Sequence, residues 1–130
     1  SSVQGKARAS AETQAMLASL KEAMGRQQAE LEAGLATARA TWSAQDSARF
    51  SETVLQSKRY ADFNKEIALL LAQLRSVWQA FQRGEIKGPA ADCRYVARLQ
   101  ELVGKLGSVY ARQSAYMNEE LRKVKPAQGR

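Results

Sequence analysis

The chain has 130 residues, the length of about one domain, and carries 20 Lys and Arg against 13 Asp and Glu, for a net charge of +7. It contains two prolines, one cysteine and no histidine, which excludes Ser-His-Asp and Cys-His catalytic groups and every zinc site that uses histidine. Because the chain has so few prolines, we expect an all-α protein. Because it has no histidine, we expect no enzymatic activity, and we also expect no cofactor and no bound metal.

The first predicted helix spans about residues 4–40. Its large apolar side chains are spaced rather than grouped, and no run in the chain approaches the roughly 20 apolar residues of a membrane span. Two columns of residues recur at intervals of seven: Leu17, Met24, Leu31 and Ala38, with Leu20, Gln27 and Gly34 beside them. This pattern is weaker than in the rest of the chain, so the helix needs its neighbours for stability.

A turn is predicted near residues 41–47. Thr41, Ser43, Asp46 and Ser47 are all favourable N-cap residues. The segment lacks glycine and proline, so the alternative is one continuous helix of about 80 residues that ends at Arg83. Such a helix is far longer than is usual in a domain of this size, and we therefore favour the turn.

The second predicted helix, about residues 46–83, carries the strongest repeat of the chain. Its columns at intervals of seven are Tyr60, Ile67, Leu74 and Phe81; Phe63, Leu70 and Val77; and Leu71 with Trp78. A strict repeat of seven keeps its columns aligned when helices pack lengthwise in a left-handed supercoil. Asn64 shares the column of Leu71 and Trp78, where it is either a buried polar residue that fixes register or an exposed edge residue.

The third predicted helix spans about residues 90–124 and follows the only cluster of helix breakers. Gly84 suits a helix C-cap and Pro89 suits the start of the next helix. Three columns follow: Val96, Val103, Tyr110, Met117 and Val124; Leu99 and Leu106; and Leu102, Val109 and Tyr116. Cys93 falls in the first turn without a neighbouring base, so we expect a passive thiol.

Three helices of similar length with short connections predict an elongated antiparallel three-helix bundle, or a coiled-coil-like helical hairpin plus a third helix, over residues 1–124. We expect the heptad columns of the second and third helices to form an interaction seam. Its members are Tyr60, Ile67, Leu71, Leu74, Trp78, Phe81, Val96, Val103, Tyr110 and Met117.

The C-terminal end is basic, and residues 125–130 are predicted to form a flexible tail. Its cations and those just before it are Arg122, Lys123, Lys125 and Arg130. Such a cluster suits contact with nucleic acid or an anionic membrane. Charges of both signs alternate elsewhere, which is typical of a solvated surface.

Trp42 lies at the predicted turn and Phe50 follows it eight residues later. Here the sequence resembles the WXG-type family of small helical-hairpin proteins handled by type VII secretion systems. In that family a tryptophan and a glycine two residues on mark the turn, whereas this chain has Ala44 at the glycine position. The resemblance covers roughly residues 10–84 and implies a secreted or secretion-associated protein. An aromatic pair that caps a bundle end, without any family, explains the same residues, and a turn at residues 41–47 predicts that Trp42 packs near Phe50.

Three functions remain open from the sequence. The first is a WXG-like protein that binds a protein partner or forms a homodimer. The second is a coiled-coil structural subunit or adaptor of a larger complex. The third is a basic helical module on an anionic membrane or nucleic acid, against which the interior position of the aromatic residues counts. Either a cytoplasmic or a secreted location fits a chain with no visible cleavable signal peptide.

Overall fold

The computed structural model describes residues 2–85 and 89–124, and within them the side chains of all residues except 2–10, 13 and 89–93. The described chain consists of α1 (Ser2–Arg39), α2 (Ala44–Phe50), a π-helical turn η1 (Ser51–Leu55), α3 (Lys58–Gln82) and α4 (Pro89–Lys123). No strand occurs among these residues. The predicted all-α bundle is therefore confirmed.

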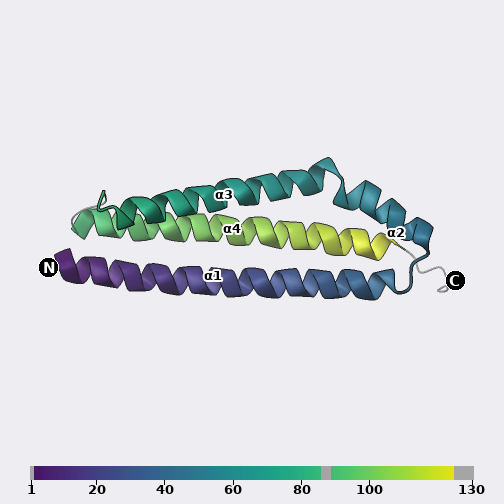
Figure 1. The fold of residues 1–130 in the computed structure, drawn as a ribbon, viewed down its shortest axis with the longest axis horizontal. Coiled ribbons are helices and arrows are strands. Elements are labelled where there is room, and N and C mark those ends of the chain that lie inside the picture. The colour runs from purple at the N-terminus through teal and green to yellow at the C-terminus, as the bar shows by residue number, and fades with distance from the viewer. Residues whose placement is uncertain (1, 86–88, 125–130) are drawn as a thin grey trace.

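The long helices lie side by side in an elongated bundle in which α4 is the central element (Figure 1). α1 and α4 run in the same direction and α3 runs opposite to both. α4 packs along α1 and along α3, whereas α1 and α3 approach each other much less closely. The solvent-accessible area of 8547 Å² exceeds the roughly 6,800 Å² of a compact chain of this size, as expected for a rod.

The hydrophobic core follows the predicted heptad columns. Leu20 of α1 and Leu74 of α3 belong to the same buried cluster, so the chain folds back between them. The most deeply buried side chains are all on α4: Leu99, Leu102, Leu106 and Val109. These four residues come from the two α4 columns that point between α1 and α3, and this is why α4 is the axis of the bundle.

The predicted turn after the first helix is confirmed. α1 ends at Arg39, and Thr41 stabilises its last turn by donating a hydrogen bond from Oγ1 to the carbonyl of Ala38, at 2.8 Å. Ser43 then caps α2, because its Oγ accepts a hydrogen bond from the backbone N–H of Asp46 at 3.0 Å. A hydroxyl N-cap thus starts the new helix without any glycine or proline.

The prediction of one uninterrupted helix over residues 46–83 is wrong. The helix ends in η1, and Gln56 and Ser57 separate it from α3. Phe50 and Val54 are buried on one face of the helix. If the helix continued, the next residues on that face would be the polar residues 57 and 58. The apolar stripe of α3 has a different phase, so the break brings both stripes onto α4.

Ser57 holds this break in place. Its Oγ accepts the N–H of Tyr60 at 3.1 Å, donates to the carbonyl of Val54 at 2.6 Å, and lies 3.2 Å from the Tyr116 hydroxyl of α4. The residue therefore caps α3, terminates η1 and ties both to the central helix.

The end of α3 and the start of α4 agree with prediction, and residues 86–88 between them lie outside the described residues. Gly84 has a φ of 74°, the left-handed conformation that glycine adopts without a steric penalty. Its N–H donates to the carbonyl of Phe81, and the N–H of Glu85 donates to the carbonyl of Ala80, each at 3.1 Å. These bonds form a Schellman C-cap, and α4 begins at Pro89 as expected.

Candidate protein-interaction surfaces

An aromatic pair closes the end of the bundle where α1 turns into α2. Trp42 is half-buried and its ring centroid lies 5.0 Å from that of Phe50, with the planes tilted by 48°. Phe50 is only 2% exposed and belongs to a second buried cluster with Val54 and Met117. The prediction that Trp42 packs on Phe50 at the turn is confirmed, and both residues act as a plug for this end.

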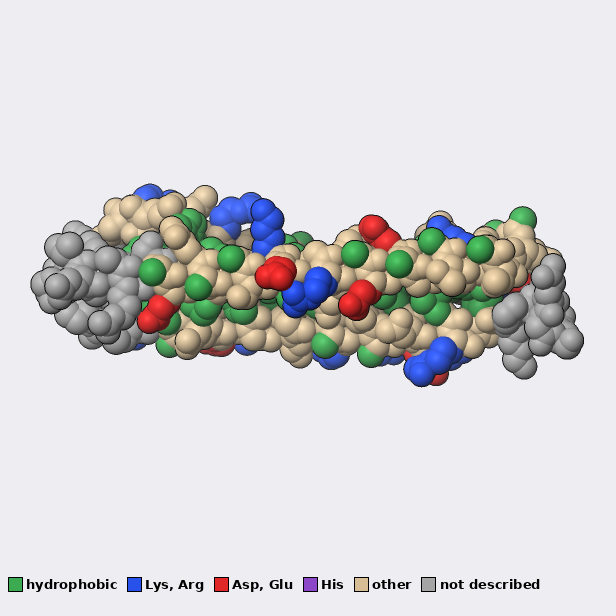
Figure 2. Space-filling model, turned by 90° about the horizontal axis from the view of Figure 1, so that it is seen from below, with side chains coloured by type: hydrophobic (Ala, Val, Ile, Leu, Met, Phe, Trp, Pro, Cys, Tyr) green, Lys and Arg blue, Asp and Glu red, His purple; other side chains and the backbone are tan. Residues whose placement is uncertain are grey.

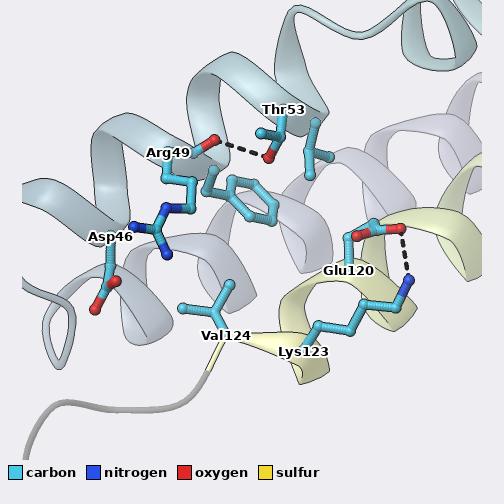
Figure 3. Close-up of a pocket in the computed structure, with 8 residues that line it drawn as sticks. Asp46, Arg49, Thr53, Glu120, Lys123 and Val124 are labelled. Carbon is cyan, nitrogen blue, oxygen red and sulfur yellow. Dashed lines mark hydrogen bonds and ion pairs between the residues drawn. The ribbon is translucent and has the colours of Figure 1, made fainter.

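An open hollow of about 390 Å³ lies beside the plug, between α2–η1 and the end of α4 (Figure 3). Phe50 and Val54 also line it, and its remaining lining residues are Asp46, Arg49, Thr53, Glu120, Lys123 and Val124. Lys123 pairs with Glu120 at 3.1 Å, and the Thr53 hydroxyl donates to the carbonyl of Arg49 at 2.8 Å. The negative charges of Asp46 and Glu120 balance the positive charges of Arg49 and Lys123 in this hollow. The Thr53 hydroxyl is already hydrogen-bonded, so the lining residues include no nucleophile paired with a general base.

The predicted interaction seam lies largely inside the chain. Ile67, Leu74 and Met117 are buried. The other members are half-buried at the edges of the core, and they are Tyr60, Leu71, Trp78, Phe81, Val96, Val103 and Tyr110. At the far end of the bundle Phe81 stacks on Tyr95, with ring centroids 4.2 Å apart. The seam therefore joins α3 and α1 to α4, and much of it is already covered.

A polar contact crosses the α3–α4 interface. Nε2 of Gln113, which is 6% exposed, donates to Oδ1 of Asn64 at 2.9 Å. Asn64 itself is exposed, so it stands at the edge and reaches inward to a buried amide. Asn64 is therefore an exposed edge residue, and its hydrogen bond with the buried Gln113 favours one register of α3 on α4.

A groove of about 200 Å³ opens where α1 and α3 diverge above α4. We call it the α1–α3 groove, and its lining residues are Gln28, Leu31, Glu32, Leu35, Leu55, Tyr60, Asn64, Ile67, Tyr110, Gln113 and Met117. Most of these side chains are apolar, and Glu32 is the one charged group among them. Partial burial at this place raises the pKa of the Tyr110 phenol.

The outer face of α3, which we define by Lys65, Ala68, Leu69 and Ala72, presents exposed apolar side chains beside one charged residue. Leu69 is 57% exposed, and the three others are also exposed. Leu69 belongs to none of the heptad columns, so the repeat of seven does not mark it. The signal was nevertheless present: residues 67–72 are six consecutive apolar residues, which make this turn of helix apolar on every side.

The basic cluster at the C-terminal end is partly neutralised. Arg122 pairs with Glu119, and Lys123 pairs with Glu120, within the last turns of α4. Lys125 and Arg130 lie outside the described residues, as does the predicted tail. Figure 2 shows the molecule from below the view of Figure 1. On this face hydrophobic side chains line the furrow between the helices, and charged side chains of both signs are scattered over the surface.

The described residues contain no group of three or more metal-ligating side chains and no helix long and apolar enough to cross a membrane. The side chain of Cys93 lies outside the description. Comparison of the chain with protein-family models, with curated proteins and with solved structures gives no match. The all-α bundle and its two apolar surfaces, the α1–α3 groove and the outer face of α3, are therefore the basis for assigning a function.

Proposed function

We propose that this chain is a non-enzymatic helical protein that acts through contacts with other proteins, and that the outer face of α3 is its principal contact surface. The observation that carries the proposal is the apolar turn at residues 67–72. Packing on α4 covers only its inner half, and Leu69 remains 57% exposed on the outer half. A fully buried leucine is worth about 1.5–3 kcal/mol relative to an exposed one, so a partner gains appreciably by covering it.

The small residues next to Leu69 support this choice of surface. Ala68 and Ala72 are exposed, and their short side chains allow another helix to approach closely. An isolated exposed leucine is common on protein surfaces. Leu69 differs from such a case because it lies within an uninterrupted apolar run beside Ala68 and Ala72, while Lys65, Glu66 and Gln73 form the polar margin of the patch.

The proposal is tested by affinity purification of the tagged chain from its native host after chemical cross-linking. We expect Leu69→Lys to lose the partner that the unmodified chain retains, because a charge at the centre of the contact cannot be desolvated cheaply. Gln79→Lys is the matched control, since it adds the same charge at an exposed position of α3. Equal recovery of every cross-linked partner by both variants would contradict the assignment.

A WXG-like secreted or secretion-associated protein is the more specific form of this proposal. The packing of Trp42 on Phe50 at the α1–α2 turn favours it, while Ala44 in place of the glycine and the position of α4 between α1 and α3 are departures from a simple hairpin. Its test is export: the chain should reach the culture medium, and it should remain in cells whose type VII system is disabled.

The rival is a coiled-coil subunit or adaptor, which predicts retention in the cell within a stable complex. We place both ahead of an anionic membrane or nucleic-acid partner, because Arg122 and Lys123 already pair with glutamates of α4. Binding to heparin that survives removal of residues 125–130 would reverse this order.

A further inference from the structure

We propose that the chain associates with further copies of itself, with Leu69 of one copy inserted into the α1–α3 groove of the next. This inference rests on the proposed function, since it names the occupant of a protein-contact surface. It joins an exposed apolar side chain, which projects from the surface, to a recessed groove with a largely apolar lining.

The two features match in size and polarity. The groove of about 200 Å³ is lined by half-buried Leu31, Leu35 and Tyr60 among other apolar groups, and this space accommodates a leucine side chain. Leu69 is the one large hydrophobic side chain in the described part of the chain that is classed as exposed. Its neighbours Ala68 and Ala72 are small, so α3 of one copy can approach closely to α1 and α3 of the other copy at the groove.

The charges beside these features are also complementary. Glu32 is the one charged residue that lines the groove, and its carboxylate accepts a hydrogen bond from Nε2 of Gln28 at 3.0 Å. Two charges stand one turn before Leu69: Glu66, which pairs with Arg112 of α4 at 3.4 Å, and Lys65, which has no ion pair with any residue that the structure describes. When Leu69 enters the groove, the ammonium group of Lys65 is available to the Glu32 carboxylate.

The contact is not made within one molecule, and we infer that it is heterologous. Ile67 lines the groove, and Leu69 is two residues later, on nearly the opposite side of the same helix. Each copy therefore offers a leucine on one side and a groove on another. Contacts of this kind generate rings or open chains rather than closed two-fold dimers, so we expect association that continues beyond two copies as concentration rises.

The test is sedimentation velocity of the purified full chain at physiological ionic strength over a wide range of concentration. We expect the weight-average sedimentation coefficient to rise with concentration for the unmodified chain. Leu69→Lys should weaken association by roughly thirtyfold or more, the size of a hot-spot loss. Gln79→Lys, which adds the same charge elsewhere on α3, should associate like the unmodified chain.

A charge exchange tests the register of the contact. Glu32→Lys and Lys65→Glu should each weaken association by roughly fivefold, in the range of a partly exposed ion pair. The double variant, Glu32→Lys with Lys65→Glu, should restore association, because the pair is re-formed with its signs reversed. Glu32 and Lys65 are both exposed, and circular dichroism melting curves verify that each variant stays folded.

Several outcomes would overturn the inference: a chain that stays monomeric at every concentration, association that survives Leu69→Lys, or a double variant no better than the single ones. A strictly two-fold dimer would also overturn it. The proposed function fails separately. If purified chain is monomeric but Leu69→Lys still loses a partner from the native host, then the outer face of α3 binds another protein and self-association is wrong.

Discussion

Two connections join the long helices α1, α3 and α4, and they depend on different physical interactions. At the α3–α4 connection, α3 ends in a glycine C-cap and α4 begins at Pro89. Between α1 and α3 the chain passes through two helix starts, at Ala44 and Lys58, each capped by a serine and separated by the π-helical turn η1. The first connection depends on backbone conformation and the second on side chains.

This difference shows which kinds of turn can be predicted from a sequence. Glycine and proline restrict φ and remove hydrogen-bond donors, so their effect is local and visible. The break at Gln56–Ser57 arises because the apolar stripe of Phe50 and Val54 is out of phase with that of α3. Neither residue at the break is a strong helix breaker, and only burial on α4 makes the interruption favourable.

The largest expected effect is at the side-chain connection. Phe50→Ala should lower the free energy of unfolding by about 3–5 kcal/mol, because the ring is 2% exposed and its removal leaves a cavity between α2–η1 and α4. Urea denaturation measures the change. Glu52→Ala, at an exposed position in η1, should stay within about 0.5 kcal/mol. Trp42→Ala should cost less than Phe50→Ala, since the indole is half-buried.

The next largest loss of stability is expected at the α3–α4 connection. Gly84→Ala should destabilise the bundle by about 1–2 kcal/mol, because the φ of 74° forces the new Cβ towards a carbonyl oxygen. The same substitution at Gly104, in an α4 helical turn with open space around it, should stabilise by about 0.5–1 kcal/mol. Thermal melts of the two variants should therefore shift in opposite directions. A loss at Gly104 equal to that at Gly84 would show that backbone conformation is not what distinguishes the α3–α4 turn.

The serine at the break provides a comparison within the side-chain connection. Ser57→Ala should cost about 1 kcal/mol as the loss of an N-cap, and more than Ser43→Ala, whose cap bond is exposed and has no contact with Tyr116. Tyr116→Phe removes only the hydroxyl contact and should have a smaller effect than Ser57→Ala. Equal losses for Ser43→Ala and Ser57→Ala would mean that the tie to α4 adds nothing to capping.

The smallest expected effect lies on the surface of α4, away from both connections. The hydrogen bond from Lys105, and the positive charges of Lys105 and Arg98, lower the pKa of the Glu101 carboxyl below 4.5. A lowered folded-state pKa means that this pairing is present at neutral pH and is lost as pH falls through that pKa. Lys105→Met should move the pKa of Glu101 up towards 4.5 in an NMR titration, with the fold unchanged. An unmoved pKa would remove Lys105 as its cause.

The interaction surfaces were predicted less well than the fold. Trp42 and Phe50 were identified from their spacing at a turn, and the structure places their rings together. The seam residues were identified from their repeat, but the repeat does not say whether a column faces a neighbouring helix of the same chain or a partner. Leu69 was missed because the search followed columns at intervals of seven, while the relevant signal was an uninterrupted apolar run.

The sequence by itself determined that the chain is helical, where α1 and α3 end, where α4 begins, and which columns are apolar. These properties follow from helix periodicity and from the local preferences of serine, glycine and proline, which act within a few residues. Only the tertiary structure decided that α4 lies between α1 and α3, that the second helix breaks at Ser57, and that Gln113 reaches Asn64. Each of these depends on which apolar stripe is buried against which, and that choice is made by residues far apart in the chain.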